Sequence, residues 1–229
     1  MPDTYGEFYA HRAPGPWRAR ALRCWHQRLV ALAAPWIGRR VLELGPGHGF
    51  AADALVARGC RWQGIEQCEA GAAALRARGL ECLTATVPPL PDGPAADTVW
   101  LSHVLEHCGS PAEARALVVA CAERLAPGGS LVVVAPDIVS WGAQFWALDW
   151  SHGYPTASER IRQLLHEAGL DVVSARTHAF GVPGAAGTVL AALYGAVPFA
   201  PADALARGLW RGLGATWGWR QVLVIGRRP

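Results

Sequence analysis

The stretch Val41-Leu42-Glu43-Leu44-Gly45-Pro46-Gly47-His48-Gly49-Phe50 decides the fold of this chain. Apolar residues on both sides of Glu43 predict a buried strand, and glycines at every second position predict a sharp turn into a helix that begins near Phe50. Glycine permits positive φ and lets a ligand approach the backbone, and the start of a helix offers unpaired N–H groups. The stretch therefore predicts a nucleotide-like ligand lying against the turn.

Outward from this turn, strand-like and helix-like segments alternate along the chain with short connections between them. The expected strands are residues 41–44, 60–66, 80–84, 97–102, 130–135, 170–175 and 220–225, and the expected helices are 17–36, 51–58, 70–78, 112–125 and 158–168. We expect Thr156 or Ser158 to cap the last helix, and Pro127-Gly128-Gly129 to turn the chain into the fifth strand. The pattern predicts an α/β fold with a doubly wound, mostly parallel seven-stranded sheet, helices on both faces, and a ligand crevice at the carboxyl ends of the strands.

The length of 229 residues favours a single domain over the whole chain. Within residues 1–229 we expect an N-terminal arm and helix over 1–37, a cofactor-binding core over 38–136, and a substrate-side half over 137–229. The substrate-side half includes a helical insert at about 180–219, because this connection is longer than ordinary helix–strand connections.

Composition excludes several classes of protein. A formal net charge of +3, spread along the chain without a basic stripe, argues against nucleic acid as a partner. The six cysteines are not in CxxC pairs, so we predict reduced thiols and no metal site. The N-terminus lacks a secretory signal, and the apolar stretch 185–200 is interrupted by glycine and proline. We therefore expect a cytoplasmic protein without stable membrane insertion, as a monomer or homodimer.

The residues around the glycine turn bear on which nucleotide it holds. A dinucleotide site has the spacing G-x-G-x-x-G, whereas here the third glycine is Gly49 and Phe50 stands where a small residue is needed. A carboxylate at Glu43 would repel a pyrophosphate but suits a ligand with a cationic amine and a sulfonium. An NAD-linked oxidoreductase is thus the weaker alternative.

The stretch Glu43-Leu44-Gly45-Pro46-Gly47-His48-Gly49 resembles motif I of the class I S-adenosylmethionine-dependent methyltransferases. Glu66, at the end of the second expected strand, resembles the acid that binds the ribose hydroxyls in that family. Four further segments match the family in order and spacing: Leu90-Pro91-Asp92-Gly93, Asp97-Thr98-Val99, Val104-Leu105-Glu106-His107 and Leu125-Ala126-Pro127-Gly128-Gly129. Each motif is loose by itself, but their co-occurrence over roughly residues 38–175 is specific. The resemblance implies S-adenosyl-L-methionine as cofactor and S-adenosyl-L-homocysteine as product.

The resemblance also implies roles for individual residues. Gly45, Pro46, Gly47 and Gly49 would wrap the methionine part, with Glu43 holding its amino group directly or through water. Glu66 would bind the ribose, and Gln67 would pack against the adenine. The remaining cofactor-binding residues would be Leu44, Ala85, Thr86, Val87, Ser102 and His103. Thr84 and Ala85 stand where the family usually has an aspartate followed by a small residue. Because the aspartate is missing, the adenine amine would be bound by the Thr86 hydroxyl or by a backbone carbonyl.

Methyl transfer from a sulfonium needs alignment and exclusion of water, and needs a base only when the acceptor carries a proton. The candidate catalytic residues are His152 and His107. His152 is either a base facing the acceptor or an ordinary loop histidine, and His107 is either catalytic or structural. His103 follows the fourth expected strand at the crevice, and its backbone is a candidate cofactor contact. For Glu106 we favour a solvated carboxylate at a helix start.

The acceptor is expected to be a small, apolar or aromatic molecule, with oxygen favoured as the methylated atom. Tyr5, Tyr9 and Trp146 are the candidate substrate-binding residues. The tryptophans that cluster in 141–150 and 210–219 either line this pocket or pack the extra helices onto the sheet. Shallow contact of residues 190–210 with a membrane surface is a weaker alternative. From another class of protein, a cofactor-binding partner without catalysis stays open.

Overall fold

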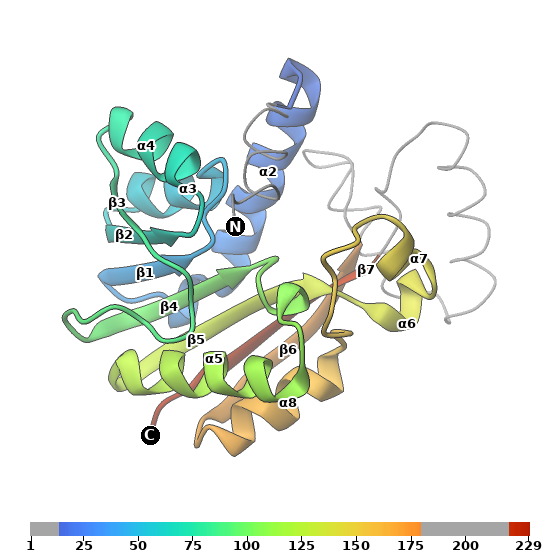
Figure 1. The fold of residues 1–229 in the computed structure, drawn as a ribbon. Coiled ribbons are helices and arrows are strands. Elements are labelled where there is room, and N and C mark those ends of the chain that lie inside the picture. The colour runs from blue at the N-terminus through green and yellow to red at the C-terminus, as the bar shows by residue number, and fades with distance from the viewer. Residues whose placement is uncertain (1–13, 180–219) are drawn as a thin grey trace.

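A computed structural model describes residues 14–179 and 220–229 of the chain. Its seven-stranded sheet has the order β3-β2-β1-β4-β5-β7-β6, in which β7 runs antiparallel to both of its neighbours (Figure 1). The other four pairings are parallel. The strands are β1 Arg40–Leu44, β2 Arg61–Glu66, β3 Glu81–Thr84, β4 Ala96–Ser102, β5 Leu125–Pro136, β6 Asp171–Ala179 and β7 Arg220–Arg227. The predicted α/β fold with a mostly parallel sheet is confirmed.

Helices cover both faces of the sheet (Figure 1). One face packs against α2 (Pro16–Ala33), α3 (Phe50–Ala57) and α4 (Glu69–Ala77), and the other against α5 (Pro111–Arg124) and α8 (Ser158–Glu167). Side chains of β4 alternate between the two cores, with Trp100 on the α2 side and Leu101 on the α5 side, both 0% exposed. Burial on both faces explains why the central strands are apolar throughout.

Short elements follow the carboxyl ends of β4 and β5. They are the 3₁₀ helix η2 (Leu105–His107) and the helices α6 (Ile138–Trp141) and α7 (Gln144–Ala147). A further 3₁₀ turn, η1 (Ala34–Trp36), extends α2 toward β1. Apart from η1, which falls within the expected helix 17–36, each is too short to produce a periodic apolar pattern, so the sequence did not reveal it.

Two local predictions are wrong. Residues 125–129 belong to β5, because Leu125 already pairs with Ala96 and the register shifts before Ser130 pairs with Thr98. Neither predicted residue caps α8: its N-cap is Ala157, and the Thr156 hydroxyl instead donates to Pro136 O at 2.6 Å. In both cases contact with the end of the sheet decides the local structure.

The six cysteines are all free thiols. Within residues 14–179 and 220–229, no helix has both the length and the apolar character needed to cross a membrane. Predictions that concern Tyr5, Tyr9 and the insert 180–219 lie outside the described residues.

Candidate active site

The turn after β1 holds three glycines in the left-handed region, with φ of 63° at Gly45, 51° at Gly47 and 76° at Gly49. A Cβ at Gly45 would lie 2.8 Å from Val104 Cγ2, and one at Gly49 would lie 2.6 Å from Leu75 Cδ2. Among residues 14–179 and 220–229, a Cβ at Gly47 would meet nothing within 4 Å. Gly45 and Gly49 are thus needed for packing as well as for conformation, whereas Gly47 leaves bare backbone facing open space.

Glu66 lies beside this turn at the end of β2 and is 8% exposed. Its Oε2 accepts a hydrogen bond from Gly47 N at 3.1 Å, and its Oε1 accepts one from Cys68 N at 3.1 Å. The carboxylate therefore ties the glycine turn to the start of α4. The contact of Glu66 with a ribose stays a prediction.

Glu43 is more deeply buried, at 2% exposure, and accepts a 2.7 Å hydrogen bond from Trp62 Nε1. The pKa of Glu43 is raised to about 8. Burial is the largest cause, the hydrogen bond from Trp62 opposes it, and the charge of Glu66 adds to it. At pH 7 the carboxyl is mostly neutral, and a nearby ammonium would favour its ionised form. The predicted contact with a ligand amine stays a prediction.

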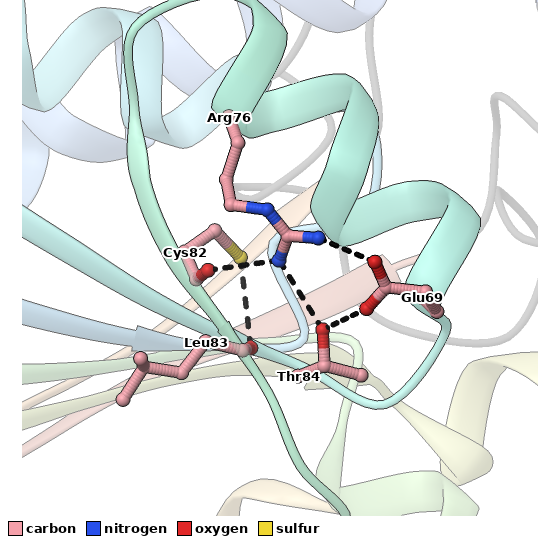
Figure 2. Close-up of polar contacts among 5 residues, drawn as sticks. All are labelled: Glu69, Arg76, Cys82, Leu83 and Thr84. Atoms are coloured by element: carbon pink, nitrogen blue, oxygen red, sulfur yellow. Dashed lines mark hydrogen bonds and ion pairs between the residues drawn. The ribbon is translucent and has the colours of Figure 1, made fainter.

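On the other side of β2, β3 is held by a network of side chains on α4 (Figure 2). The Thr84 hydroxyl donates to Glu69 Oε2, and Arg76 bonds to Glu69 Oε1, Thr84 Oγ1 and Cys82 O. The Thr84 side chain thus points to α4, as Figure 2 shows. Ala85 N donates to Glu66 O at 3.1 Å, and Gln67 and Thr86 are exposed beside this edge.

His103, which is partly exposed, pairs with the buried Glu106 just after β4. His103 has φ of 59°, and its N–H donates to Val134 O, so its backbone nitrogen belongs to the sheet. His103 Nδ1 lies 2.9 Å from Glu106 Oε1, and the Glu106 side chain is 0% exposed. The interpretation of Glu106 as a solvated acid is therefore wrong, because η2 turns its side chain inward. Although burial alone would raise the pKa of Glu106, His103 lowers it, while Glu106 raises the pKa of His103 against burial.

His107 and His152 lie side by side although they are far apart in the sequence. Ser151, next to His152, is 44 positions from His107. Their ring centroids lie 5.0 Å apart in an edge-to-face arrangement. Burial lowers the pKa of His107, and His152 is 9% exposed. Gly153 N and Tyr154 N donate to Glu106 O at 2.9 and 3.1 Å, and these bonds hold the segment of His152 against η2.

The partners of both imidazoles were not predicted. His152 Nδ1 lies 2.6 Å from Phe145 O, and His107 Nδ1 lies 2.8 Å from Ser151 Oγ, which in turn donates to Asp149 Oδ1 at 2.6 Å. The spacing Asp149-x-Ser151 is a local signal of such a turn, since Ser151 N also donates to Asp149 Oδ1. No sequence signal links Phe145 to His152.

The remaining predicted residues are partly placed. Ser102 ends β4 and is 8% exposed, and within the described part of the chain its hydroxyl has no hydrogen-bond partner. Trp146 on α7 is 49% exposed and packs edge-to-face on Phe145, with ring centroids 5.3 Å apart. Its contact with a substrate stays a prediction.

Comparisons with known proteins point to one family. Residues 9–175 match the family model of a methyltransferase domain. Ubiquinone biosynthesis O-methyltransferase of Alkalilimnicola ehrlichii is 35% identical over 103 residues, which cover 42% of this chain and 40% of that relative. The matched segment thus spans less than half of the length of this curated relative.

Two solved structures share the fold. A chain from the complex between the Haloferax volcanii Trm112 methyltransferase activator and a methyltransferase superposes with a TM-score of 0.71 at 21% identity, covering 100% of this chain and 99% of that chain. Phosphoethanolamine N-methyltransferase 2 of Haemonchus contortus, solved with S-adenosyl-L-methionine, superposes with a TM-score of 0.60 at 14% identity, covering 88% of this chain and 52% of that chain. At these identities the likeness concerns the fold.

Proposed function

The chain belongs to the methyltransferase domain family, and we propose that it transfers a methyl group from S-adenosyl-L-methionine to a hydroxyl of a small apolar or aromatic molecule. One observation carries the proposal: the glycine turn lies against the segment that bears His103 and His107. Gly45 packs so closely on Val104 that a Cβ would not fit between them, and Val104 immediately precedes η2 with His107. A cofactor on the turn would thus lie beside a pair of imidazoles.

The residues of the glycine turn and of the adjoining strand β2 fit the cofactor. Gly47 leaves backbone facing open space, where a side chain would obstruct a ligand. Glu66 is fixed in place by two backbone N–H groups beside that turn, as an acceptor for the ribose hydroxyls requires. Glu43 supplies a second, buried carboxyl that a cationic amine would ionise. Gln67, Thr86 and Val87 border the adenine side.

The reaction asks little chemistry of the protein. Bound S-adenosyl-L-methionine supplies a methyl group on a sulfonium, and the leaving group departs as a neutral thioether. The turn and Glu66 hold one reactant, and the segment from His103 to His107 borders the other. Alignment of the reactants and exclusion of water therefore provide most of the rate enhancement.

A hydroxyl acceptor also needs to lose its proton, and in this proposal His152 receives it. A carbonyl oxygen can only accept, so His152 Nδ1 carries the hydrogen of its bond to Phe145 O, and Nε2 is the basic nitrogen of the neutral ring. His107, next to it, orients the acceptor. The similarity to a ubiquinone biosynthesis O-methyltransferase supports oxygen as the methylated atom. Trp146 and aromatic residues outside the described part would contact the acceptor.

We retain the other predictions from the sequence as part of this proposal. They are a cytoplasmic location, a monomer or homodimer, and a small-molecule acceptor with no nucleic acid as partner. The weaker alternatives are an NAD-linked oxidoreductase and a protein that binds the cofactor without catalysis.

The test combines binding and turnover on the full chain. Isothermal titration with S-adenosyl-L-methionine, S-adenosyl-L-homocysteine and NAD is expected to give heat with the first two only. Radiolabelled methyl transfer is then assayed against phenols, catechols, aliphatic alcohols and amines, with label expected in the methyl ether of a hydroxylated aromatic acceptor. Binding of NAD without binding of the sulfonium overturns the proposal in favour of the oxidoreductase. Cofactor binding with no labelled product from any acceptor class favours the non-catalytic partner.

A further inference from the structure

We propose that Glu106, His107 and His152 form a binding site for one divalent transition-metal cation. Each residue offers one ligand atom, and the three atoms lie within 4.8 Å of one another. After small side-chain rotations, three atoms this close can surround a single ion at bonds of about 2.0–2.2 Å. The sequence predicted no metal here, because the third residue of the group is remote from the first two.

The Glu106 carboxylate provides an independent observation. Its side chain is 0% exposed, and Oε1 is occupied by His103 Nδ1. Its Oε2 is buried and has no hydrogen-bond partner among residues 14–179 and 220–229. A buried carboxylate oxygen without a partner is costly, and such groups in native proteins are usually paired or coordinate a metal. A cation between the three residues would satisfy it.

Both imidazoles use Nδ1 for a hydrogen bond, so Nε2 is the nitrogen of each ring that would coordinate a cation. His152 Nδ1 donates to the carbonyl of Phe145. Because the Ser151 hydroxyl donates to Asp149, Ser151 Oγ accepts from His107 Nδ1. In metal sites a ligating histidine typically donates its other ring N–H to a carbonyl or a carboxylate, which fixes the tautomer and the ring orientation. Here one ring is oriented by a carbonyl and the other by a serine–aspartate pair.

The backbone holds these parts together rigidly. Glu106 O accepts from Gly153 N and Tyr154 N, which places His152 opposite η2. A Cβ at Gly153 would lie 2.5 Å from Cys108 O, so the two segments approach as closely as backbone allows. A preformed arrangement of ligands binds a cation without a cost of ordering them.

The ligand set selects among cations. One carboxylate and two imidazoles suit Zn²⁺, Fe²⁺, Co²⁺ or Mn²⁺, whereas Mg²⁺ and Ca²⁺ prefer oxygen ligands. Three protein ligands also leave coordination positions open to water or to a substrate oxygen.

The site deepens the proposed function and, in this one respect, rests on it. An acceptor hydroxyl that coordinates the cation would lose its proton to water, because a bound cation lowers the pKa of a coordinated oxygen acid. The resulting oxyanion would form the O–CH₃ bond as the S–CH₃ bond breaks, and the sulfur would leave as a thioether. Nε2 of His152 would then bind the cation in place of the proton. An acceptor with two adjacent oxygens, such as a catechol, would chelate the ion.

Cation binding is tested on untagged full-length protein stripped with a chelator. We expect isothermal titration to show one equivalent of Zn²⁺ or Co²⁺ bound, with Mg²⁺ much weaker. The conservative change Glu106→Gln, which keeps an oxygen for His103, and the change His152→Ala are each expected to weaken binding by about 100-fold or more. The control His166→Ala, on an exposed histidine of α8, is expected to bind the cation as the wild type does.

A spectroscopic measurement makes the test independent of how the variants fold. Pulsed EPR of the wild type with Mn²⁺ is expected to show coupling to imidazole nitrogen. The inference is overturned by a wild type that binds no cation, by Glu106→Gln binding as tightly as the wild type, or by an absence of nitrogen coupling. Titration of the stripped protein with S-adenosyl-L-methionine separates the two proposals, since cofactor binding without cation binding refutes only this one.

Discussion

The carboxyl ends of β1 and β2 and those of β4 and β5 lie at the same edge of the sheet but are built in different ways. The first region, Gly45–Gly49 with Glu66, is made of backbone in left-handed conformation and one carboxylate tied to it. The second, His103–His107 with Ser151–His152, is made of buried and partly buried side chains that contact one another. A site built from backbone binds a common cofactor, whereas a cluster of side chains can be altered to suit a particular acceptor.

This comparison predicts that changes in one region leave the function of the other intact. The largest effect is expected for His152→Ala. Loss of a positioned base or ligand lowers kcat by about 10²–10⁴-fold, while the affinity for S-adenosyl-L-methionine stays within about twofold, because the first region is unaltered. Steady-state kinetics and isothermal titration measure both quantities, with His166→Ala as the control. Full turnover of the variant with unchanged cofactor affinity would remove His152 from the site.

The converse change is Glu66→Ala. Removing the carboxylate deletes the expected charge-assisted hydrogen bonds to the ribose, each worth about 1.5–3 kcal/mol, so cofactor affinity should fall by about 10–100-fold. Circular dichroism and urea unfolding are expected to show a retained fold. The exposed Glu123→Ala on α5 is the control for loss of one charge. Unaltered affinity for the cofactor would contradict the assignment of the first region.

A pair of glycine variants sharpens the same separation. Gly47→Ala adds a methyl group in open space at φ of 51°, so about tenfold weaker cofactor binding and a small loss of stability are expected. Gly153→Ala forces its Cβ against Cys108 O and displaces His152, so kcat should fall by about tenfold or more. Titration and kinetics on both variants test this crossing pattern. If both variants changed the same parameter, the two regions would be one coupled unit.

The smallest effect concerns Glu43 and pH. Because burial raises its pKa to about 8 from the ordinary 4.5, the folded protein binds a proton there that the unfolded chain releases above about pH 4.5. The stabilising contribution is complete below that pH and is lost as the pH rises through about 8, by at most about 1.4 kcal/mol per pH unit. Urea unfolding of the wild type and Glu43→Gln at pH 6 and 8.5 measures it. A stability difference between the two proteins that does not change with pH would contradict it.

Glu106 shows most clearly where sequence reasoning failed. An acid that follows an apolar strand and precedes a helix has the pattern of a solvated residue at a helix start. The side chain is buried because η2 turns it under the segment 152–154, which lies more than 40 positions later and closes over it. By contrast, Glu43 and Glu66 belong to strands whose apolar neighbours already predict burial.

The sequence by itself determined the sheet, the order of strands and helices up to β5, and the glycine turn. These features depend on periodicity and on the backbone freedom of glycine, which act over a few residues. Only the tertiary structure decided that Glu106, His107 and His152 meet, and which atoms hold each imidazole. That arrangement depends on β4 and β5 being neighbours and on backbone bonds between their following loops, which no local pattern encodes.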